Sequence, residues 1–260
     1  MQRTTIVIPC FNEAARLKPQ PFRDALAAAE QLSFLFVDDG STDATRLLLT
    51  SLQAEWPERI DLLALPQNMG KGEAVRQGML RAIAGPAAYV GYWDADLATP
   101  LEAIGRFAGL LDAGDHDLVL GARVLLLGRR IERRPLRHYL GRIFATCASL
   151  LLDLGVYDTQ CGAKLFRNQP LLRQVFGMPF RVSWIFDVEL LARYALLQGM
   201  SPREAGVRWV EYPLEAWIDV KGSKVRGADY LRAGLDFLTL LYHLHTPARR
   251  AYHAALTGRQ

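Results

Sequence analysis

The feature that most constrains the fold of this 260-residue chain is the alternation of short apolar segments with helix-like segments in its first half. β-Branched and aromatic residues fill the apolar segments, as in buried strands. The expected strands are 4–10, 33–39, 60–65, 88–95 and 117–122, and the expected helices lie near 21–32, 43–56, 71–84 and 100–113. Strands that alternate with helices form a mainly parallel sheet covered on both faces. We therefore predict an α/β fold.

After Arg123 the alternation stops, and the remaining segments favour a more helical second half. An apolar stretch at 139–155 precedes a helix-like segment at 185–199, a strand at 207–214 and a last amphipathic helix near 228–245. The apolar runs fall short of the ~20 residues that cross a bilayer, so no membrane span is predicted. We expect one domain over 1–260 that divides near residue 122 into a half of alternating strands and helices and a more helical half.

The polar ends of three expected strands indicate a ligand site. They read "PCFNE", "VDDGSTD" and "WDADLATP". Ends of parallel strands meet at one edge of a sheet, where ligands bind in α/β folds. Asp94 and Asp96 would repel each other there, and paired carboxylates suit Mg²⁺ or Mn²⁺. A D-x-D triplet also fits a solvated turn or a helix cap, so its position after an apolar strand is what favours a metal site.

Two further loops leave a binding role and a structural role open. Asp39 follows an apolar strand and precedes Gly40, which suits either a contact to a ribose or base, or a helix cap. The segment "NMGKGEAVRQGM" lacks the complete spacing of a phosphate-binding P-loop. Lys71 at its helix start is a candidate nucleotide contact, whereas Gly70 and Gly72 equally fit a packing role.

Positive charge is concentrated in one segment. Seven arginines and one glutamate lie within 121–142, although the formal net charge of the whole chain is only +4. A local basic cluster predicts an anionic partner at one place, and guanidinium groups bind phosphate oxygens well. The alternatives are a solvated basic loop and a non-enzymatic nucleotide- or nucleic-acid-binding module. Because the segment lacks the interleaved aromatic residues of a single-strand binder, we expect no nucleic-acid partner.

Taken together and in order, these motifs resemble those of the GT-A glycosyltransferases of family 2. The resemblance rests on "IVIPCFNEAARL", "FVDDGSTDAT", "NMGKGEAVRQGM" and "WDADLATP". The later "GAR", "DTQCGAKLF", "WIFDVELL" and "GSKV" are similar to the branch with dolichyl-phosphate glucosyltransferase and dolichol-phosphate mannose synthase. The resemblance covers roughly residues 4 to 240 and implies a GT-A nucleotide-sugar-binding fold. It also implies a nucleotide-binding half at about 1–122 and an acceptor-binding, membrane-interface half at about 123–260.

The resemblance also implies roles for individual residues. Nucleotide binding falls to Pro9, Phe11, Glu13, Asp39, Lys71 and Asp94, metal binding to Asp94 and Asp96, and binding of the acceptor phosphate or diphosphate to Arg123, Arg137, Lys221 and Lys224. The residues expected to carry catalysis are Asp94, Asp96, Arg123 and Asp187. One departure concerns Ala98, which stands where mannose synthases often have a glutamine ligand. That departure weakens an assignment to mannose.

The expected activity is inverting transfer of a hexose from a nucleotide sugar to a polyprenyl phosphate with Mg²⁺ or Mn²⁺ as cofactor. UDP-glucose is the first choice of donor and GDP-mannose the second. A lipid phosphate is already anionic, so it needs a positive cradle rather than a general base. Transfer to a glycan or protein hydroxyl would instead need a carboxylate base, for which Asp187 is the candidate. Either Asp187 or Glu189 is expected to face the site.

The remaining expectations concern location and packing. The sequence begins without a signal-peptide pattern and its three cysteines show no pairing pattern, so a reducing, cytoplasmic location is expected. The basic cluster and the apolar stretch at 139–155 predict peripheral attachment to the cytoplasmic face of a membrane. The alternative is that Ile143 and Leu150 to Leu152 pack on the core. Trp184, Phe186 and Cys161 are expected in the core, and the oligomeric state is left open.

Overall fold

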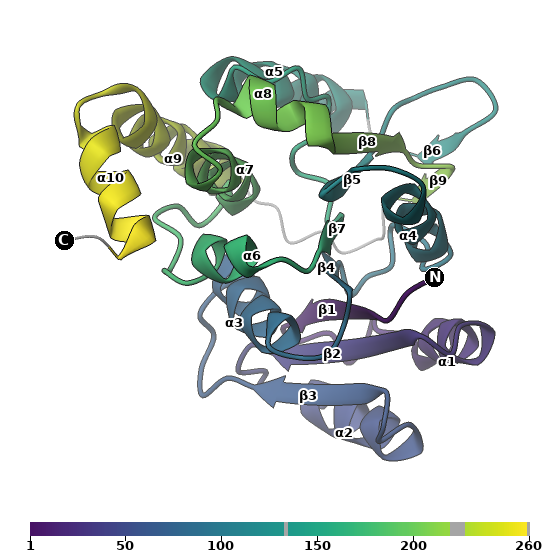
Figure 1. Cartoon of the computed structure of the whole chain (residues 1–260). Helices are drawn as coiled ribbons and strands as arrows, with labels where there is room; N and C mark the ends of the chain where they lie inside the picture. The colour runs from purple at the N-terminus through teal and green to yellow at the C-terminus, as the bar shows by residue number, and fades with distance from the viewer. Residues whose placement is uncertain (133–134, 219–226, 259–260) are drawn as a thin grey trace.

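The protein's structure, a computed structural model, describes residues 1–132, 135–218 and 227–258 (Figure 1). Its described strands are β1 (Thr4–Cys10), β2 (Leu32–Asp38), β3 (Ile60–Ala64), β4 (Tyr89–Trp93), β5 (Leu118–Ala122), β6 (Arg130–Glu132), β7 (Ala163–Arg167), β8 (Trp209–Pro213) and β9 (Ala216–Ile218). Its described helices are α1 (Pro19–Ala28), α2 (Thr45–Glu55), α3 (Lys71–Ile83), α4 (Ala103–Ala113), α5 (Pro135–Leu152), α6 (Pro170–Val175), α7 (Phe186–Leu197), α8 (Pro202–Ala205), α9 (Gly227–His245) and α10 (Ala248–Thr257), with a 3₁₀ turn at Gly206–Arg208. Each strand and helix expected from the sequence is present.

The central sheet is mainly parallel, as predicted, with one strand reversed. Its strand order is β3-β2-β1-β4-β7-β5-β8. β7 runs antiparallel to both of its neighbours, β4 and β5. The "DTQCGAKLF" segment therefore ends in a strand inserted between two others, which the sequence analysis did not assign. A separate two-stranded sheet of β6 and β9 was also not anticipated.

Two apolar cores lie on opposite faces of the sheet. On β1, Ile6 and Ile8 join one core and Val7 joins the other, which is the period-2 alternation of a strand buried on both faces. Helices α1, α2 and α4 cover the first face, and α3, α6 and α7 cover the second. This layering leaves the carboxyl ends of β1, β2 and β4 free to form a site.

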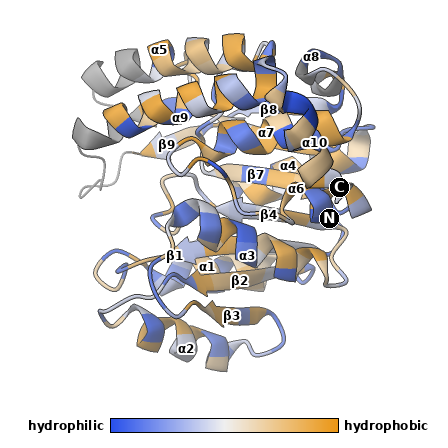
Figure 2. Cartoon of the chain, turned by 90° about the vertical axis from the view of Figure 1, so that its left-hand side faces the viewer, coloured by the Kyte–Doolittle hydropathy of each residue, from blue (hydrophilic) through white to orange (hydrophobic). Residues whose placement is uncertain are grey.

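A further helical layer lies outside α7. Helices α5 and α9 lie side by side in it (Figures 1 and 2), with the rings of Phe144 and Phe237 5.3 Å apart. Near the ends of the two helices, Nε2 of His245 lies 2.7 Å from the carbonyl oxygen of Leu151. The predicted C-terminal helical part is thus a layer packed on the second core. Among the described residues, no helix combines the length and apolarity needed to cross a membrane.

Candidate active site

One cavity of about 980 Å³ begins at the strand ends and continues between the helices of the second half. Its wall contains most of the predicted site residues: Pro9, Phe11, Glu13, Asp39, Lys71, Asp94, Asp96, Arg123 and Asp187. The three polar strand ends therefore meet in one crevice, as expected. Arg137 lies in α5, but its side chain is not among those described, and Lys221 and Lys224 lie outside the described residues.

The loops after β1 and β2 are joined by side-chain hydrogen bonds. The backbone N–H of Asn12 donates to Oγ of Ser41 at 3.0 Å, and Oδ1 of Asn12 accepts from the N–H of Thr42 at 2.9 Å. Asn12 has a φ of 50°, which asparagine tolerates better than most residues. Behind this junction, the carboxylate of Glu13 forms a two-pronged ion pair with Arg16. Both of these charged side chains line the cavity.

Asp39 fixes the loop that leads into α3. Its buried carboxylate accepts the backbone N–H groups of Met69 at 2.7 Å and Gly70 at 2.9 Å. Burial raises the pKa of Asp39, and these two hydrogen bonds act in the opposite direction. Gly70, the residue directly before α3, has a φ of +91°, a conformation that glycine adopts more readily than other residues. Asp39 is therefore not a cap of α2; it positions the residue before Lys71 while it lines the cavity.

Asp94 and Asp96 lie just beyond the end of β4. A Cβ atom at Gly162 would overlap the Asp94 carboxylate, so this glycine makes room for it. Nζ of Lys71 lies 2.5 Å from Oδ1 of Asp94, and Oδ1 of Asp96 accepts the N–H of Ala98 at 3.1 Å. Burial and the neighbouring charge of Asp94 raise the pKa of Asp96. Leu97, which follows Asp96, adopts a strained φ of 53°, which allows the chain to turn sharply.

The carboxylates of Asp94 and Asp96 could supply some, but not all, of the ligands that a divalent cation needs. Within the described ranges, no group of three or more His, Cys, Asp and Glu side chains could hold a metal ion. Mg²⁺ and Mn²⁺ are commonly bound by one or two carboxylates together with water and substrate phosphates. The donor set of Asp94 and Asp96 matches that type of site, with the remaining ligands coming from outside the protein.

Asp187 reaches the cavity from the start of α7, but its carboxylate is already engaged. Nζ of Lys164 lies 2.5 Å from its Oδ1, and the hydroxyl of Tyr92 donates to the same oxygen. Lys164 is fully buried and also donates to the carbonyl of Cys161. Burial, followed by the charge of Asp187, raises the pKa of Tyr92 well above its ordinary value, so the tyrosine remains a donor. The carboxylate of Asp187 is thus held in a fixed position by Lys164 and Tyr92.

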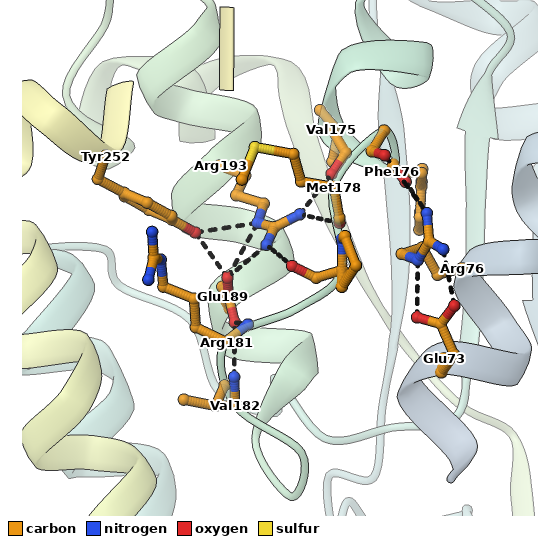
Figure 3. Close-up of polar contacts among 12 residues, drawn as sticks. Glu73, Arg76, Val175, Phe176, Met178, Arg181, Val182, Glu189, Arg193 and Tyr252 are labelled. Atoms are coloured by element: carbon orange, nitrogen blue, oxygen red, sulfur yellow. Dashed lines mark hydrogen bonds and ion pairs between the residues drawn. The ribbon is translucent and has the colours of Figure 1, made fainter. Parts of the chain in front are cut away.

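Glu189 lies away from the cavity, in a closed polar cluster (Figure 3). Its carboxylate pairs with Arg193 at 2.7 Å and accepts from the hydroxyl of Tyr252 and the N–H groups of Arg181 and Val182. Both members of the ion pair are fully buried. Of the two acidic residues near the start of α7, Asp187 therefore faces the cavity and Glu189 joins α7 to α10.

Two arginines lie where the acidic part of the cavity meets the helical part. Arg123 forms a two-pronged ion pair with Asp158, at 2.6 and 2.8 Å, and its guanidinium lies over the ring of Trp217. Burial opposes its charge, but Asp158 outweighs this and raises the pKa of Arg123. Arg142 lies over the ring of Tyr157, 3.6 Å from its centroid. Both arginines line the cavity, and each is oriented by an aromatic ring.

The far part of the cavity is apolar. Its wall there is formed by Ile143, Phe144 and Cys147 of α5, by Phe237 of α9, and by Trp184 and Phe186 at the start of α7. Phe186 is buried and Trp184 packs against the same core, so the expected packing role is confirmed and a role as cavity wall is added. Cys161 is buried, as predicted, and burial raises the pKa of its thiol to about 11. None of the three cysteines, all of which are among the described residues, forms a disulfide.

Sequence reasoning missed Lys164, Tyr92, Asp158 and Gly162. Lys164 could have been found, because it stands among the apolar residues of "GAKLF". A charged side chain in a buried strand needs a partner of opposite charge. The partner itself, Asp187, is distant in sequence, so the pairing appears only in the fold. Asp158 and Gly162 belong to the noted "DTQCGAKLF" segment, but their contacts likewise depend on the fold.

With this geometry established, comparison with known proteins identifies the family. The model of "Glycosyl transferase family 2" matches residues 5–174. The chain belongs to glycosyl transferase family 2. It is 33% identical to a dolichyl-phosphate beta-glucosyltransferase of Trichomonas vaginalis, over 89% of this chain and 72% of that protein. It is 28% identical to a polyprenol monophosphomannose synthase of Mycolicibacterium smegmatis, over 87% of this chain and 84% of that protein.

The fold of this family 2 glycosyltransferase also has solved counterparts. A crystal structure of glucosyl-3-phosphoglycerate synthase from Mycobacterium tuberculosis with Mn²⁺, UDP and glucosyl-3-phosphoglycerate matches with a TM-score of 0.62. That match covers 95% of this chain and 81% of the other at 20% identity, so it supports the fold alone. The predicted GT-A fold and the family resemblance are thereby confirmed.

Proposed function

We propose that this glycosyltransferase moves a hexose, in the first instance glucose from UDP-glucose, to a polyprenyl phosphate at a membrane surface. The observation that carries the proposal is the continuity of the cavity. It begins at Asp94 and Asp96, passes Arg123 and Arg142, and ends between the apolar walls of α5 and α9. An acceptor with a charged head and a long apolar chain fits this sequence of environments. The names of the Trichomonas and Mycolicibacterium relatives support the same acceptor class.

The nucleotide sugar belongs at the strand ends, in the half formed by residues 1–122. Pro9, Phe11, Glu13 and Asp39 form the wall on which its base and ribose would rest. Lys71 begins α3, and its charge lies where a diphosphate would meet the helix N-terminus, which favours anions. Asp94 and Asp96 would hold Mg²⁺ or Mn²⁺. When bound, the cation would supply positive charge beside the departing diphosphate.

The acceptor phosphate belongs beside the arginines, in the half formed by residues 123–260. Arg123 and Arg142 would bind its oxygens. From the sequence, we assign Arg137 to the same task and Lys221 and Lys224 to clamping the diphosphate. One acceptor oxygen forms a bond to the anomeric carbon from the side opposite the leaving group. The bond from that carbon to the diphosphate breaks with its electron pair, so the configuration inverts. The ionised acceptor needs no proton removed, so no general base is required.

The state of Asp187 favours a phosphate acceptor over a hydroxyl acceptor. Lys164 and Tyr92 both contact its Oδ1, so this oxygen is already engaged and is not open to an acceptor hydroxyl. We propose that Asp187 contributes a fixed negative charge and orients Lys71 and the sugar. This charge stabilises the protonated form of Lys71 and helps to raise its pKa. A hydroxyl acceptor would need an unengaged base here.

The outer faces of α5 and α9 support membrane attachment (Figure 2). On α9, Ala233, Leu240 and Leu244 are buried, whereas the opposite face exposes Leu231, Leu235, Leu238 and Tyr242 at 76, 65, 63 and 58%. On α5, Leu151 and Leu152 pack on the core, whereas Ile143 and Leu150 are exposed. When a helix is apolar on two opposite faces and only one of them packs on the core, the other is exposed to water. Such an exposed apolar face marks an interaction site. We name these six exposed residues the outer apolar face.

One basic residue accompanies the outer apolar face, because Arg232 is exposed on α9. Elsewhere, Arg129 and Arg130 follow the exposed leucines 125–127 after β5, and Arg130 begins β6. Each basic residue near an anionic surface contributes on the order of 1 kcal/mol. We propose that the outer apolar face rests on the cytoplasmic surface of a membrane, which brings the cavity between α5 and α9 to the lipid acceptor.

Transfer of radiolabelled sugar into organic-extractable lipid tests the proposed function. The assay contains purified protein, polyprenyl phosphate in detergent, Mn²⁺ or Mg²⁺, and labelled UDP-glucose or GDP-mannose. Label from UDP-glucose in the lipid phase supports the proposal, and label from GDP-mannose alone would reassign the sugar. Lack of labelled lipid with both donors, together with labelling of a hydroxyl acceptor, would overturn the lipid phosphate as acceptor.

A further inference from the structure

The contact between Lys71 and Asp94 places a protein cation on a metal ligand. Nζ of Lys71 lies 2.5 Å from Oδ1 of Asp94, an oxygen that a divalent cation at Asp94 and Asp96 would need. The two side chains are 45 and 35% exposed, so solvent and ligands reach the pair. An ion pair of this exposure is weak enough to exchange partners.

Helix stability does not account for a lysine at this position. Lys71 is the first residue of α3, where the helix dipole disfavours positive charge. Desolvation opposes its charge, but Asp94, Asp187 and Asp96 outweigh this desolvation and raise the pKa of Lys71. Lys71 is therefore held by the carboxylates of the site, and it remains protonated throughout the physiological pH range.

We propose that Lys71 is a resident counter-ion of the metal site that couples metal binding to nucleotide binding. Without nucleotide, its charge offsets one of the two negative charges of Asp94 and Asp96 and occupies Oδ1, which weakens binding of a divalent cation. A sugar nucleotide offers the Lys71 ammonium a second anion, its diphosphate, directly at the helix N-terminus. Lys71 then turns from Asp94 to the diphosphate and leaves Oδ1 for the cation. The inference rests on the proposed function, since it needs both ligands at this site.

The coupling has a consequence for each ligand alone. The cation and the nucleotide should each bind more tightly when the other is present, and by the same factor, because coupling is reciprocal. Removal of the Lys71 charge should strengthen binding of the cation alone and weaken binding of the nucleotide alone. A residue with a merely structural role in α3 would weaken both or neither.

Mn²⁺ titration followed by electron paramagnetic resonance of the free ion tests this without measuring activity. The full chain is titrated with and without UDP, as wild type, Lys71→Met and Lys71→Arg. We expect UDP to tighten Mn²⁺ binding of the wild type roughly 10-fold, a coupling typical of linked sites. We expect Lys71→Met to bind Mn²⁺ alone roughly 10-fold more tightly than the wild type. UDP should still tighten Mn²⁺ binding of this variant through its phosphate oxygens, but by a smaller factor than in the wild type. Lys71→Arg, which keeps the charge, should behave like the wild type.

Two controls distinguish a failure of this inference from a failure of the proposed metal site on which it rests. Addition of Asp96→Asn to Lys71→Met should abolish the gain, and a gain that persists would show that Mn²⁺ binds elsewhere and overturn the inference. UDP binding measured calorimetrically in EDTA should be several-fold weaker for Lys71→Met. If the wild type binds Mn²⁺ with UDP but Lys71→Met binds Mn²⁺ alone no more tightly, the inference fails while the metal site stands. Absence of Mn²⁺ binding by the wild type in both conditions overturns the metal site and the inference together.

Discussion

The two ends of the cavity are stabilised by different means. At the acidic end, Asp39 follows β2 and Asp94 and Asp96 follow β4, on either side of β1, and backbone N–H groups or Lys71 hold their carboxylates. At the apolar end, α5 and α9 form the wall mainly through side chains such as Phe144 and Phe237. The acidic end is thus suited to fixing charges in place, whereas the apolar end is suited to accepting a chain without directional contacts. A single enzyme of this kind needs both, because its two proposed substrates have opposite requirements.

The largest expected effect concerns the acidic end. Asp96→Asn keeps the size of the side chain and removes one of the two charges that would hold the cation. Stabilisation of the leaving diphosphate is worth several kcal/mol, so we expect transfer to fall about 10³-fold. Transfer into lipid measured with saturating donor checks this, with thermal unfolding as a control for folding. A loss smaller than tenfold would show that the acidic end does not act through a metal.

A second prediction concerns the polar cluster beneath the helical layer. Glu189→Gln leaves Arg193 buried without its countercharge, and breaking such a pair costs about 3–5 kcal/mol. For a chain of this size we expect the melting temperature to fall by about 10 °C. Differential scanning calorimetry measures this change. Because Glu189 lies outside the cavity, transfer per folded molecule should stay within about twofold of the wild type.

Asp187→Asn provides the matched contrast, two residues earlier on α7. It leaves Lys164 buried without its countercharge, so a loss of stability is expected here too. In this variant, however, transfer per folded molecule should also fall, because the negative charge of Asp187 no longer stabilises the nearby ammonium of Lys71. Equal behaviour of Glu189→Gln and Asp187→Asn in both assays would contradict the division between cavity and scaffold.

A third prediction concerns the apolar end. The double substitution Leu235→Ser and Leu238→Ser removes two side chains of the outer apolar face without touching the core. Burial of one leucine is worth about 1.5–3 kcal/mol, so binding to vesicles with anionic lipid should weaken at least about tenfold. Leu47→Ser on α2, where Leu47 is 75% exposed but lies outside that face, is the control and should bind normally. Flotation with vesicles measures both, and equal loss in the control would argue against a defined membrane face.

The two ends of the cavity differ in how far they could be predicted from the sequence. The geometry of the sheet explains this difference. Parallel strands bring their carboxyl ends to one edge, so residues far apart in sequence, such as Asp39 and Asp94, were predictable neighbours. The reversed strand β7 obeys no such rule, so neither its place beside β4 nor the contact of Gly162 with Asp94 was predicted. Partners of buried charges, such as Lys164 for Asp187, also depend on this strand.

The apolar end was predictable only in part, because periodicity alone does not distinguish a core face from a membrane face. The stretch at 139–155 fits either, and the fold assigns Leu151 and Leu152 to the core but leaves Ile143 and Leu150 outside. Helix α9 carries two apolar faces, and the fold determines which of the two is covered. The nucleotide-binding half and the acceptor-binding half thus remain a proposal for function, whereas the sheet and its layers are confirmed.

The smallest effect compares two cysteines, one at each end. Cys147 is exposed on α5 between Ile143 and Leu150, whereas Cys161 is buried and its thiol has a pKa raised to about 11. Because the thiolate is the reactive form, Cys161 should resist alkylation at pH 8 in the native protein, and Cys147 should react within minutes. Addition of anionic vesicles should then slow the labelling of Cys147 several-fold, since the outer apolar face would cover it. Mass spectrometry of the alkylated peptides measures both rates, and unchanged labelling of Cys147 at saturating vesicles would place α5 away from the lipid.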